Sequence, residues 1–307
     1  MPRKARMLIE GETAVYHVMS RTALDGFVMG DAEKDYLLQL IKHLSRVYFA
    51  EILAFCLMGN HFHIVVRMHT EDRYSDENIK ERFLHYYGDS RTLAPGHIPM
   101  LRQKWASLSE FMKEIKQGFS RYYNKRHKRR GFFWADRYKS VIVEEGETLI
   151  NCLAYVDLNP VRAGIVQRPD DYRWNSLGYH LQTGNRDGFL SLDFGLQDCR
   201  ELNKNARLAR YRQFVYEVGG MASGKGRVID AEVVEAERKK GFSPSRSDRF
   251  LARSRYFTDS GIIGSREFIR NMWQQLRGRD DNPDKMPVPI SGLSGIYSLK
   301  RVSENIL

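Results

Sequence analysis

The sequence predicts an α+β fold, in which helices pack on a sheet that contains antiparallel strands. Short runs rich in β-branched and aromatic residues alternate with amphipathic helical patterns from residue 13 to residue 160. Two of these runs are separated only by Met58-Gly59-Asn60, and Gly-Asn is common punctuation in a β-hairpin. The resulting order of β, α, β-hairpin, α, β, α is typical of α+β proteins.

Apolar periodicity, helix-capping residues and proline define the individual elements. Strands are predicted at residues 13–20, 51–57, 61–68 and 138–144. Helices are predicted after Asp31, after Ser107 and at residues 147–158. Ser107 with Glu110 three residues later forms a capping box. Pro160 disfavours helical geometry in the residue before it, so the last helix is expected to end near Asn159.

The chain divides by composition into a core, a connector and a tail. The predicted segments are a core domain at residues 1–182, a charged insertion within it at residues 70–105, a helical connector at residues 183–222 and a basic, mainly helical C-terminal extension at residues 223–307. Helices in these outer segments are predicted at residues 78–86, 202–218, 230–240 and 265–275.

Positive charge gathers in one aromatic-rich segment. The chain has a net charge of +11, and residues 113–139 carry 10 basic and 2 acidic side chains. The same segment contains Phe119, Tyr122, Tyr123, Phe132, Phe133, Trp134 and Tyr138. Basic side chains neutralise phosphates and flat rings stack on unpaired bases, so the segment indicates a nucleic-acid contact. A solvated amphipathic helix followed by a basic turn is the alternative.

Other protein classes are disfavoured by composition and motifs. No apolar run reaches the length of a membrane span, and no apolar run follows the basic residues 1–6 as in a secretory signal. The three cysteines form neither a disulfide framework nor a metal knuckle, so we expect a cytoplasmic protein. Phosphate-loop, serine-hydrolase and H-E-x-x-H motifs are absent from the sequence.

The sharpest local motif is His61-Phe62-His63. On a strand, alternate side chains share a face, so both imidazoles point one way and can chelate one divalent ion. Two surface histidines without a ligand are the plain alternative. A zinc hydrolase that adds His17 or Cys56 as third ligand also remains open at this point.

A second group of polar side chains lies on the helix at residues 147–158. Asn151, Tyr155 and Asn159 recur every four residues and form one stripe. If the stripe faces the histidine pair, Asn159 would supply an oxygen to the metal. Tyr155 would then be a nucleophile beside a polarised phosphate. Simple packing of the tyrosine ring is the alternative.

These motifs together resemble a known family. The chain resembles the small single-tyrosine HUH transposases of insertion sequences, including the REP-associated tyrosine transposases. The matching segments are residues 16–21 (YHVMSR), 58–63 (MGNHFH), 131–140 (GFFWADRYKS), 155–164 (YVDLNPVRAG) and 172–176 (YRWNS). The resemblance covers roughly residues 5–182 and departs from minimal members in the insertion and the C-terminal extension.

The resemblance implies a ferredoxin-like nuclease core and a defined catalytic centre. By this resemblance His61, His63 and Asn159 hold Mg²⁺ or Mn²⁺. Tyr155 attacks the scissile phosphate of single-stranded DNA, forms a 5′-phosphotyrosine link and releases a 3′-hydroxyl.

The resemblance also implies the partners and setting of the protein. The expected partner is single-stranded or hairpin DNA in the bacterial cytoplasm, in association with the nucleoid. No membrane partner is expected, and relatives act both as monomers and as homodimers. The expected DNA contacts are Arg21, Arg121, Lys125, Arg129, Arg130, Arg137 and Lys139.

One alternative function comes from a different class. A domesticated regulator that binds hairpin DNA without cleaving it would retain the fold and the basic surface, although a pure binder needs neither the histidine pair nor the tyrosine. The role of residues 223–307 stays open between a DNA grip and a packing element.

Overall fold

The computed structural model describes residues 6–89, 91–195, 203–221, 226–229, 232, 257, 260–276, 286–290 and 295–300. Its strands are β1 (Ala14–Arg21), β2 (Ala50–Leu57), β3 (His61–Met68), β4 (Lys139–Val143), β5 (Ile262–Gly264), β6 (Val288–Pro289) and β7 (Tyr297–Ser298). Its α-helices are α1 (Asp31–Val47), α2 (Asp76–Tyr87), α3 (Ile98–Ala106), α4 (Leu108–Arg126), α5 (Glu147–Asp157), α6 (Asn159–Arg162), α7 (Ser176–Thr183), α8 (Lys204–Gly219) and α12 (Arg266–Gln275). Short 3₁₀ turns lie at Glu71–Arg73, Pro95–His97 and Pro169–Asp171.

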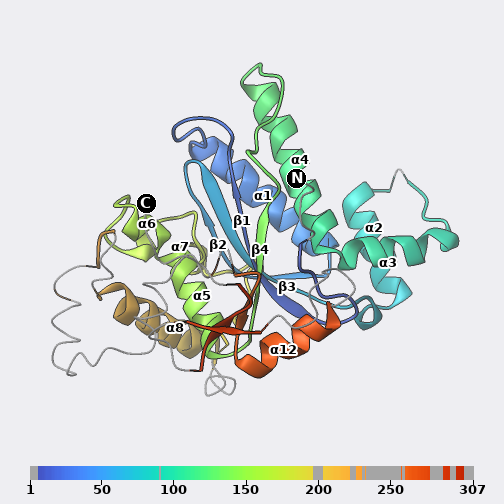
Figure 1. Ribbon diagram of the computed structural model, residues 1–307. Coiled ribbons are helices and arrows are strands. Elements are labelled where there is room, and N and C mark those ends of the chain that lie inside the picture. Colours follow the sequence, from blue (N-terminus) through green and yellow to red (C-terminus); the bar gives the residue numbers. More distant parts are fainter. Residues whose placement is uncertain are drawn as a thin grey trace.

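The α+β prediction is confirmed by one seven-stranded sheet with helices packed around it (Figure 1). The strand order is β2-β3-β1-β4-β5-β7-β6, and the first four strands pair antiparallel. This order of β1–β4 is that of a ferredoxin-like core. Of the described helices, none is long and apolar enough to cross a membrane.

Helices cover both faces of the core sheet. Phe62 of β3 packs against Trp134, which also contacts Phe119 of α4. The next residue, His63, points to the opposite face, where its ring meets Tyr155 of α5. Helices α4 and α5 therefore lie on opposite faces of the sheet.

The insertion at residues 70–105 is more helical than its sequence indicated. The single helix predicted at residues 78–86 corresponds to α2, and α3 is an additional helix that buries Ile98, Leu101 and Trp105. Helix α3 has only nine residues. So short a run gives a weak periodic signal, which is why α3 was not predicted.

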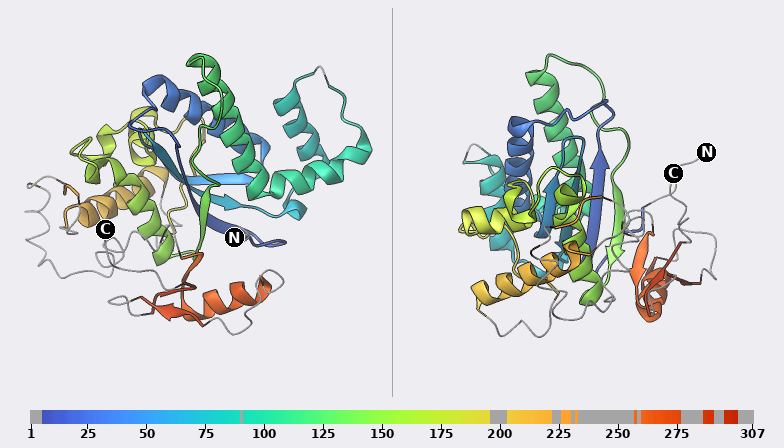
Figure 2. Two further views of the ribbon diagram at one scale, coloured as in Figure 1. Left: turned by 45° about the horizontal axis from the view of Figure 1, so that its top comes forward. Right: turned by 90° about the vertical axis from the view of Figure 1, so that its left-hand side faces the viewer.

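The C-terminal extension contributes strands as well as helices. The helices predicted at 202–218 and 265–275 correspond to α8 and α12, whereas of the helix predicted at residues 230–240 only Glu232 is described. Strand β5 pairs parallel with β4, and β7 and β6 continue the sheet beyond it (Figure 2). Glu144, just after β4, accepts hydrogen bonds from the backbone nitrogen and hydroxyl of Ser265, the N-cap of α12. The extension is thus hydrogen-bonded to the edge of the core sheet.

A buried carboxylate fixes the end of α5. Asp157 has no solvent exposure and accepts hydrogen bonds from Ser176 Oγ (2.7 Å), the Leu177 backbone nitrogen (3.0 Å) and the Tyr211 hydroxyl (2.6 Å). Its backbone carbonyl accepts a further bond from Asn175 Nδ2. Burial raises the pKa of Asp157 to about 6, against the opposing effect of these hydrogen bonds. Helices α5, α7 and α8 are therefore joined at one side chain.

Replacing this carboxylate tests its role in the fold. Asp157→Ala leaves three buried donors without an acceptor, so we expect the free energy of unfolding to fall by about 3 kcal/mol. Asp157→Asn keeps the shape and an acceptor oxygen, and should lose less. Urea unfolding at neutral pH measures both, and an Asp157→Ala loss no larger than that of Asp157→Asn would contradict this role.

Candidate active site

Strand register brings three histidines to one face of the sheet. Antiparallel pairing places His61 opposite Arg21 and His63 opposite Met19, so His17 is a diagonal neighbour of His63. The rings of His17 and His63 are stacked with centroids 5.1 Å apart, and His61 lies 5.1 Å from His63. His17 and His63 are 1% and 3% exposed, whereas His61 is half-buried.

The two buried histidines belong to one chain of hydrogen bonds. His17 Nδ1 lies 2.8 Å from the backbone oxygen of Phe257, and His17 Nε2 lies 2.9 Å from His63 Nδ1. Burial lowers the pKa of His17 to about 4. Burial, with the neighbouring His17 and His61, also lowers the pKa of His63 well below its ordinary value. Both rings are therefore neutral at pH 7.

His61 has a separate hydrogen-bond partner. Its Nδ1 lies 2.7 Å from Asn60 Oδ1, and an amide oxygen only accepts, so Nδ1 carries the proton and Nε2 keeps a lone pair. Burial, and secondly the charge of Arg21, lower the pKa of His61 to about 4. A neutral imidazole with an unprotonated Nε2 is the form that binds a metal ion.

Tyr155 faces this cluster, as the predicted mechanism requires. Its ring lies edge-on to His17 and His63, with both centroid distances 5.8 Å. It is stacked on Phe257 at 5.5 Å, and the guanidinium carbon of Arg162 lies 5.4 Å from its centroid. The side chain is 8% exposed. The tyrosine and the histidines therefore form one cluster within a single chain.

The predicted polar stripe on α5 is otherwise internal. All residues of α5 from Thr148 to Asp157 are buried, and Asn151 Nδ2 donates back to the Glu147 carbonyl. Asn159 Nδ2 donates to the carbonyls of Tyr155 and Val156, at 2.9 and 3.3 Å. The amide nitrogen of Asn159 thus closes the end of the tyrosine helix, which leaves its oxygen as the atom it could offer to a metal.

The zinc-hydrolase alternative finds no support in this geometry. Both ring nitrogens of His17 are engaged in hydrogen bonds. Cys56 is fully buried, and burial raises the pKa of its thiol well above its ordinary value. In the described part of the chain, no group of three or more His, Cys, Asp or Glu side chains could hold a metal ion. A site built on His61 and His63 therefore needs a ligand of another type, such as an amide.

The predicted DNA contacts fall into two groups. Three of them lie at the end of the sheet that carries His61: Arg21 at the end of β1, Arg137 just before β4, and Lys139, which pairs with Met19. The others lie at the end of α4 and the turn beyond it: Arg121, Lys125, Arg129 and Arg130. All seven are exposed except Arg129, which is half-buried.

Most of the aromatic rings near this basic segment are not available for stacking on bases. Four of the seven are buried: Phe119, Tyr123, Phe133 and Tyr138. Tyr122 stacks on Tyr36 of α1, and the Trp134 indole donates to the Lys116 carbonyl. Phe132, 89% exposed, is the exception. Most of these rings therefore join α4 to the segment before β4, and stacking on bases in the predicted nucleic-acid contact is left to the exposed ring of Phe132.

A second exposed ring lies close by. Phe27 is 82% exposed and sits directly over Gly59, where an added Cβ would come within 2.8 Å of the Phe27 Cβ. The loop of Phe27 and that of Phe132 are joined by the Ala23 nitrogen, which donates to the Phe133 carbonyl at 2.7 Å. Two exposed rings therefore flank the end of the sheet that carries His61.

Four residues of the site were not assigned these roles from the sequence: His17, Asp157, Arg162 and Phe257. From the sequence alone, His17 was weighed as a third zinc ligand and not as a partner of His63. Alternation along β1 places His17 and Met19 on the same face of the strand, and this pattern could have indicated where His17 lies. Phe257 lies 240 residues from His17, and no local pattern could have linked the two.

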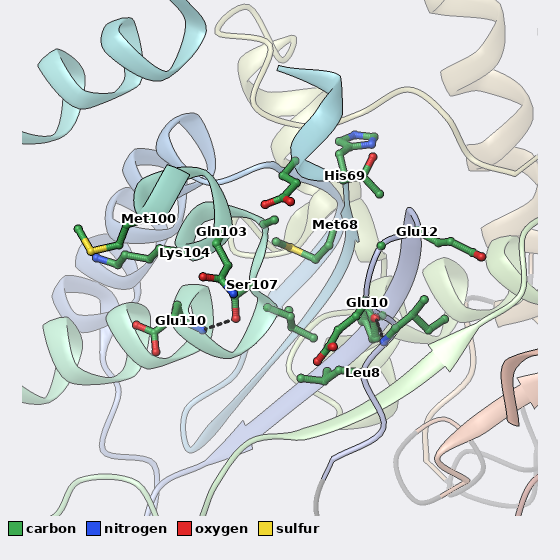
Figure 3. Close-up of a pocket in the computed structure, with 17 residues that line it drawn as sticks. Leu8, Glu10, Glu12, Met68, His69, Met100, Gln103, Lys104, Ser107 and Glu110 are labelled. Atoms are coloured by element: carbon green, nitrogen blue, oxygen red, sulfur yellow. Dashed lines mark hydrogen bonds between the residues drawn. The ribbon is translucent and has the colours of Figure 1, made fainter. Parts of the chain in front are cut away.

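The pocket in Figure 3 lies elsewhere, at the opposite end of the core sheet. It has a volume of about 540 Å³ and is lined by residues of the N-terminal segment, the end of β3 and helices α3 and α4, among them Glu10, Met68 and Gln103. None of the predicted site residues lines it.

Neighbouring phenylalanines test the assignment of the aromatic segment. Phe133 is 1% exposed, so Phe133→Ala should lower the free energy of unfolding by about 3–5 kcal/mol. Phe132→Ala removes an exposed ring and should change it by less than about 0.5 kcal/mol. Urea unfolding of the two variants gives the comparison, and similar losses would refute the assignment.

Comparison with known proteins agrees with the motifs. The family model described as "Transposase IS200 like" matches residues 92–159, a segment that includes α4, β4 and Tyr155. Among solved structures, a REP-associated tyrosine transposase bound to a REP hairpin is similar at 16% identity and a TM-score of 0.41, over 63% of this chain and 90% of that chain. No curated protein matches. Residues 92–159 are thus similar to the IS200-like transposases, in agreement with the motifs that the sequence carries there.

Proposed function

We propose that this protein cleaves and rejoins single-stranded DNA, with Tyr155 as nucleophile and Mg²⁺ or Mn²⁺ held by His61 and His63. The observation that carries the proposal is the position of the Tyr155 ring, 5.8 Å from the ring of His63 and within the same chain. The family match, which includes Tyr155, supports a transposase role. A pure DNA-binding regulator would not need a tyrosine packed against neutral, metal-competent histidines.

The chemistry assigned to each side chain follows from its surroundings. A phenol with an ordinary pKa of about 10 is a weak nucleophile. A bound divalent ion would polarise the scissile phosphate and stabilise the leaving oxygen. His61 and His63 would hold the ion through Nε2, with the Asn159 amide oxygen as third ligand. Arg162, whose pKa is lowered by burial, places a positive charge near the Tyr155 ring, where negative charge develops on the phenolic oxygen.

The proposed step is a balanced transesterification. The Tyr155 oxygen forms a bond to phosphorus, and the bond from phosphorus to the 3′-oxygen breaks. The phenolic proton is released, and the 3′-oxygen gains one to become a hydroxyl. One phosphodiester replaces another, so the 5′-phosphotyrosine can return the strand to a 3′-hydroxyl without ATP. Because Tyr155 faces the histidines of its own chain, we propose that a monomer carries a complete centre, even if the protein dimerises on DNA.

The DNA path is proposed from exposed charge. Arg21, Arg137 and Lys139 would hold the strand at the cleavage centre, and the cations at the end of α4 would hold the backbone of a hairpin. Phe132 and Phe27 are placed to stack on unpaired bases beside the centre. A protein acting on such DNA would work at the bacterial nucleoid.

Loss of the nucleophile gives the first test. With a labelled hairpin-bearing single strand and Mn²⁺, the native protein should form a covalent adduct that survives a denaturing gel, and chelation of the metal should abolish it. Tyr155→Phe should bind the hairpin but form no adduct. Adduct formation by Tyr155→Phe would show that another residue is the nucleophile.

Tyr172→Phe is the matched control. Tyr172 is buried and its hydroxyl donates to the Leu57 carbonyl at 2.6 Å, outside the cluster. It should form the adduct normally. Hairpin binding by the native protein without an adduct under any divalent ion would favour the regulator.

Phe132→Ala and Lys125→Ala should weaken DNA binding in different ways. Loss of a stacking ring should cost about 1–3 kcal/mol of single-strand affinity with an unchanged salt dependence. Loss of a phosphate contact should instead reduce the slope of log affinity against log salt by about 0.7–0.9. Fluorescence anisotropy across a salt series separates the two, and an unchanged affinity for Phe132→Ala would remove this ring from the DNA path.

A further inference from the structure

We propose that the C-terminal extension completes the catalytic centre. The Phe257 carbonyl, acting through His17, fixes the tautomer of His63 that leaves Nε2 free for a metal ion. This inference rests on the proposed function, since it concerns the same centre. It assigns a positioning role to Phe257, which lies outside the core domain predicted at residues 1–182. The sequence left the role of the C-terminal extension at residues 223–307 open.

The direction of each hydrogen bond is fixed by the first acceptor. A backbone carbonyl oxygen can only accept, so the 2.8 Å contact requires the proton of neutral His17 to be on Nδ1. His17 Nε2 then has a lone pair and accepts from His63 Nδ1 over 2.9 Å. The proton of neutral His63 is thereby placed on Nδ1, and its Nε2 is left unprotonated.

The opposite arrangement would disable the metal ligand. Without an acceptor at Nδ1, His17 could carry its proton on Nε2 and donate to His63 Nδ1. His63 would then hold its own proton on Nε2, and a protonated ring nitrogen cannot ligate a metal. His61 reaches the ligating tautomer through Asn60 instead, so only His63 depends on the extension. Partners of this kind set both the tautomer and the orientation of a metal-binding histidine.

The sheet explains how so distant a residue reaches His17. Strand β4 pairs with β1, where Val141 lies opposite His17, and with β5, where Ile142 lies opposite Ile262. Phe257 precedes β5 by five positions in the sequence and is fully buried. The anchored edge of the extension thus brings the Phe257 backbone next to the histidine face.

The side chain of Phe257 contacts the other half of the centre. Its ring is stacked on Tyr155 with centroids 5.5 Å apart and planes inclined by 22°. One residue of the extension therefore contacts both the histidine pair, through its carbonyl, and the proposed nucleophile, through its ring. A simple DNA grip would have no need of either contact.

The tautomer of His63 is the direct readout. In ¹⁵N spectra of histidine-labelled, metal-free protein at neutral pH, native His63 should show the Nδ1-protonated form. His17→Phe removes both hydrogen bonds and should shift His63 toward the Nε2-protonated form. His17→Gln should restore the native form, because its amide can donate to the Phe257 carbonyl and accept from His63. An Nε2-protonated His63 in the native protein, or no change in His17→Phe, overturns the proposal.

Metal affinity gives a second readout that does not depend on activity. Calorimetric titration with Mn²⁺ should show an affinity loss of about 10–100-fold for His17→Phe and a smaller loss for His17→Gln. Equal affinity of His17→Phe and the native protein would also overturn the proposal.

Two variants within the extension separate a specific contact from general loosening. Phe257→Leu keeps the backbone carbonyl but removes the stacked ring, so it should slow adduct formation and leave Mn²⁺ affinity unchanged. Ile269→Ala, at a fully buried position on α12, should change neither. If Ile269→Ala slows adduct formation as much as Phe257→Leu does, the Phe257 ring contributes only general packing and has no specific effect on Tyr155.

Failure of this proposal differs from failure of the proposed function. A native protein that forms the Tyr155 adduct while His63 is protonated on Nε2 overturns the role of the extension alone. If His63 is protonated on Nδ1 but the protein never forms an adduct, the role of Phe257 and His17 in setting the tautomer of His63 would stand. The proposed cleavage function would then be overturned.

Discussion

The antiparallel pairing of β1 with β3 is the constraint on which the rest of the site depends. It places His17 and His63 on one face as diagonal neighbours and sets His61 at the end of the strand, opposite Arg21. A slip of one residue would turn both histidines of β3 to the opposite face, which belongs to α4. Strand β1 also pairs with β4, and β4 pairs with β5 of the C-terminal extension. The histidine face is therefore connected to the extension through β4.

The second half of the centre is held by burial. Helix α5 is buried on every side from Thr148 onward, and its last residue, Asp157, accepts hydrogen bonds from α7 and α8. These hydrogen bonds limit movement of α5 along its axis. The position of the Tyr155 ring relative to His17 and His63 is therefore fixed. The Asn159 amide nitrogen donates to the Tyr155 carbonyl and so stays close to the proposed nucleophile. The buried carboxylate of Asp157 and the proposed catalytic residues Tyr155 and Asn159 therefore lie within one short segment.

Much of this could be predicted because it is local. Alternation on β3 predicted that His61 and His63 share a face, and the capping box at Ser107 predicted the start of α4. Strands β5, β6 and β7 have two or three residues each, too few for a periodic signal. Aromatic spacing did not distinguish core rings from rings free to stack on bases, because both alternate with basic residues. The contact of Phe257 with His17 depends on the sheet order alone.

Anomalous diffraction from crystals soaked in Mn²⁺ would locate a metal ion bound at the histidine face. The proposed metal site predicts one manganese ion bound by Nε2 of both His61 and His63, on the sheet face that α5 covers and with Tyr155 beside it. A manganese ion bound through Nδ1 of either ring, or bound only elsewhere while both Nε2 atoms remain free, would contradict it.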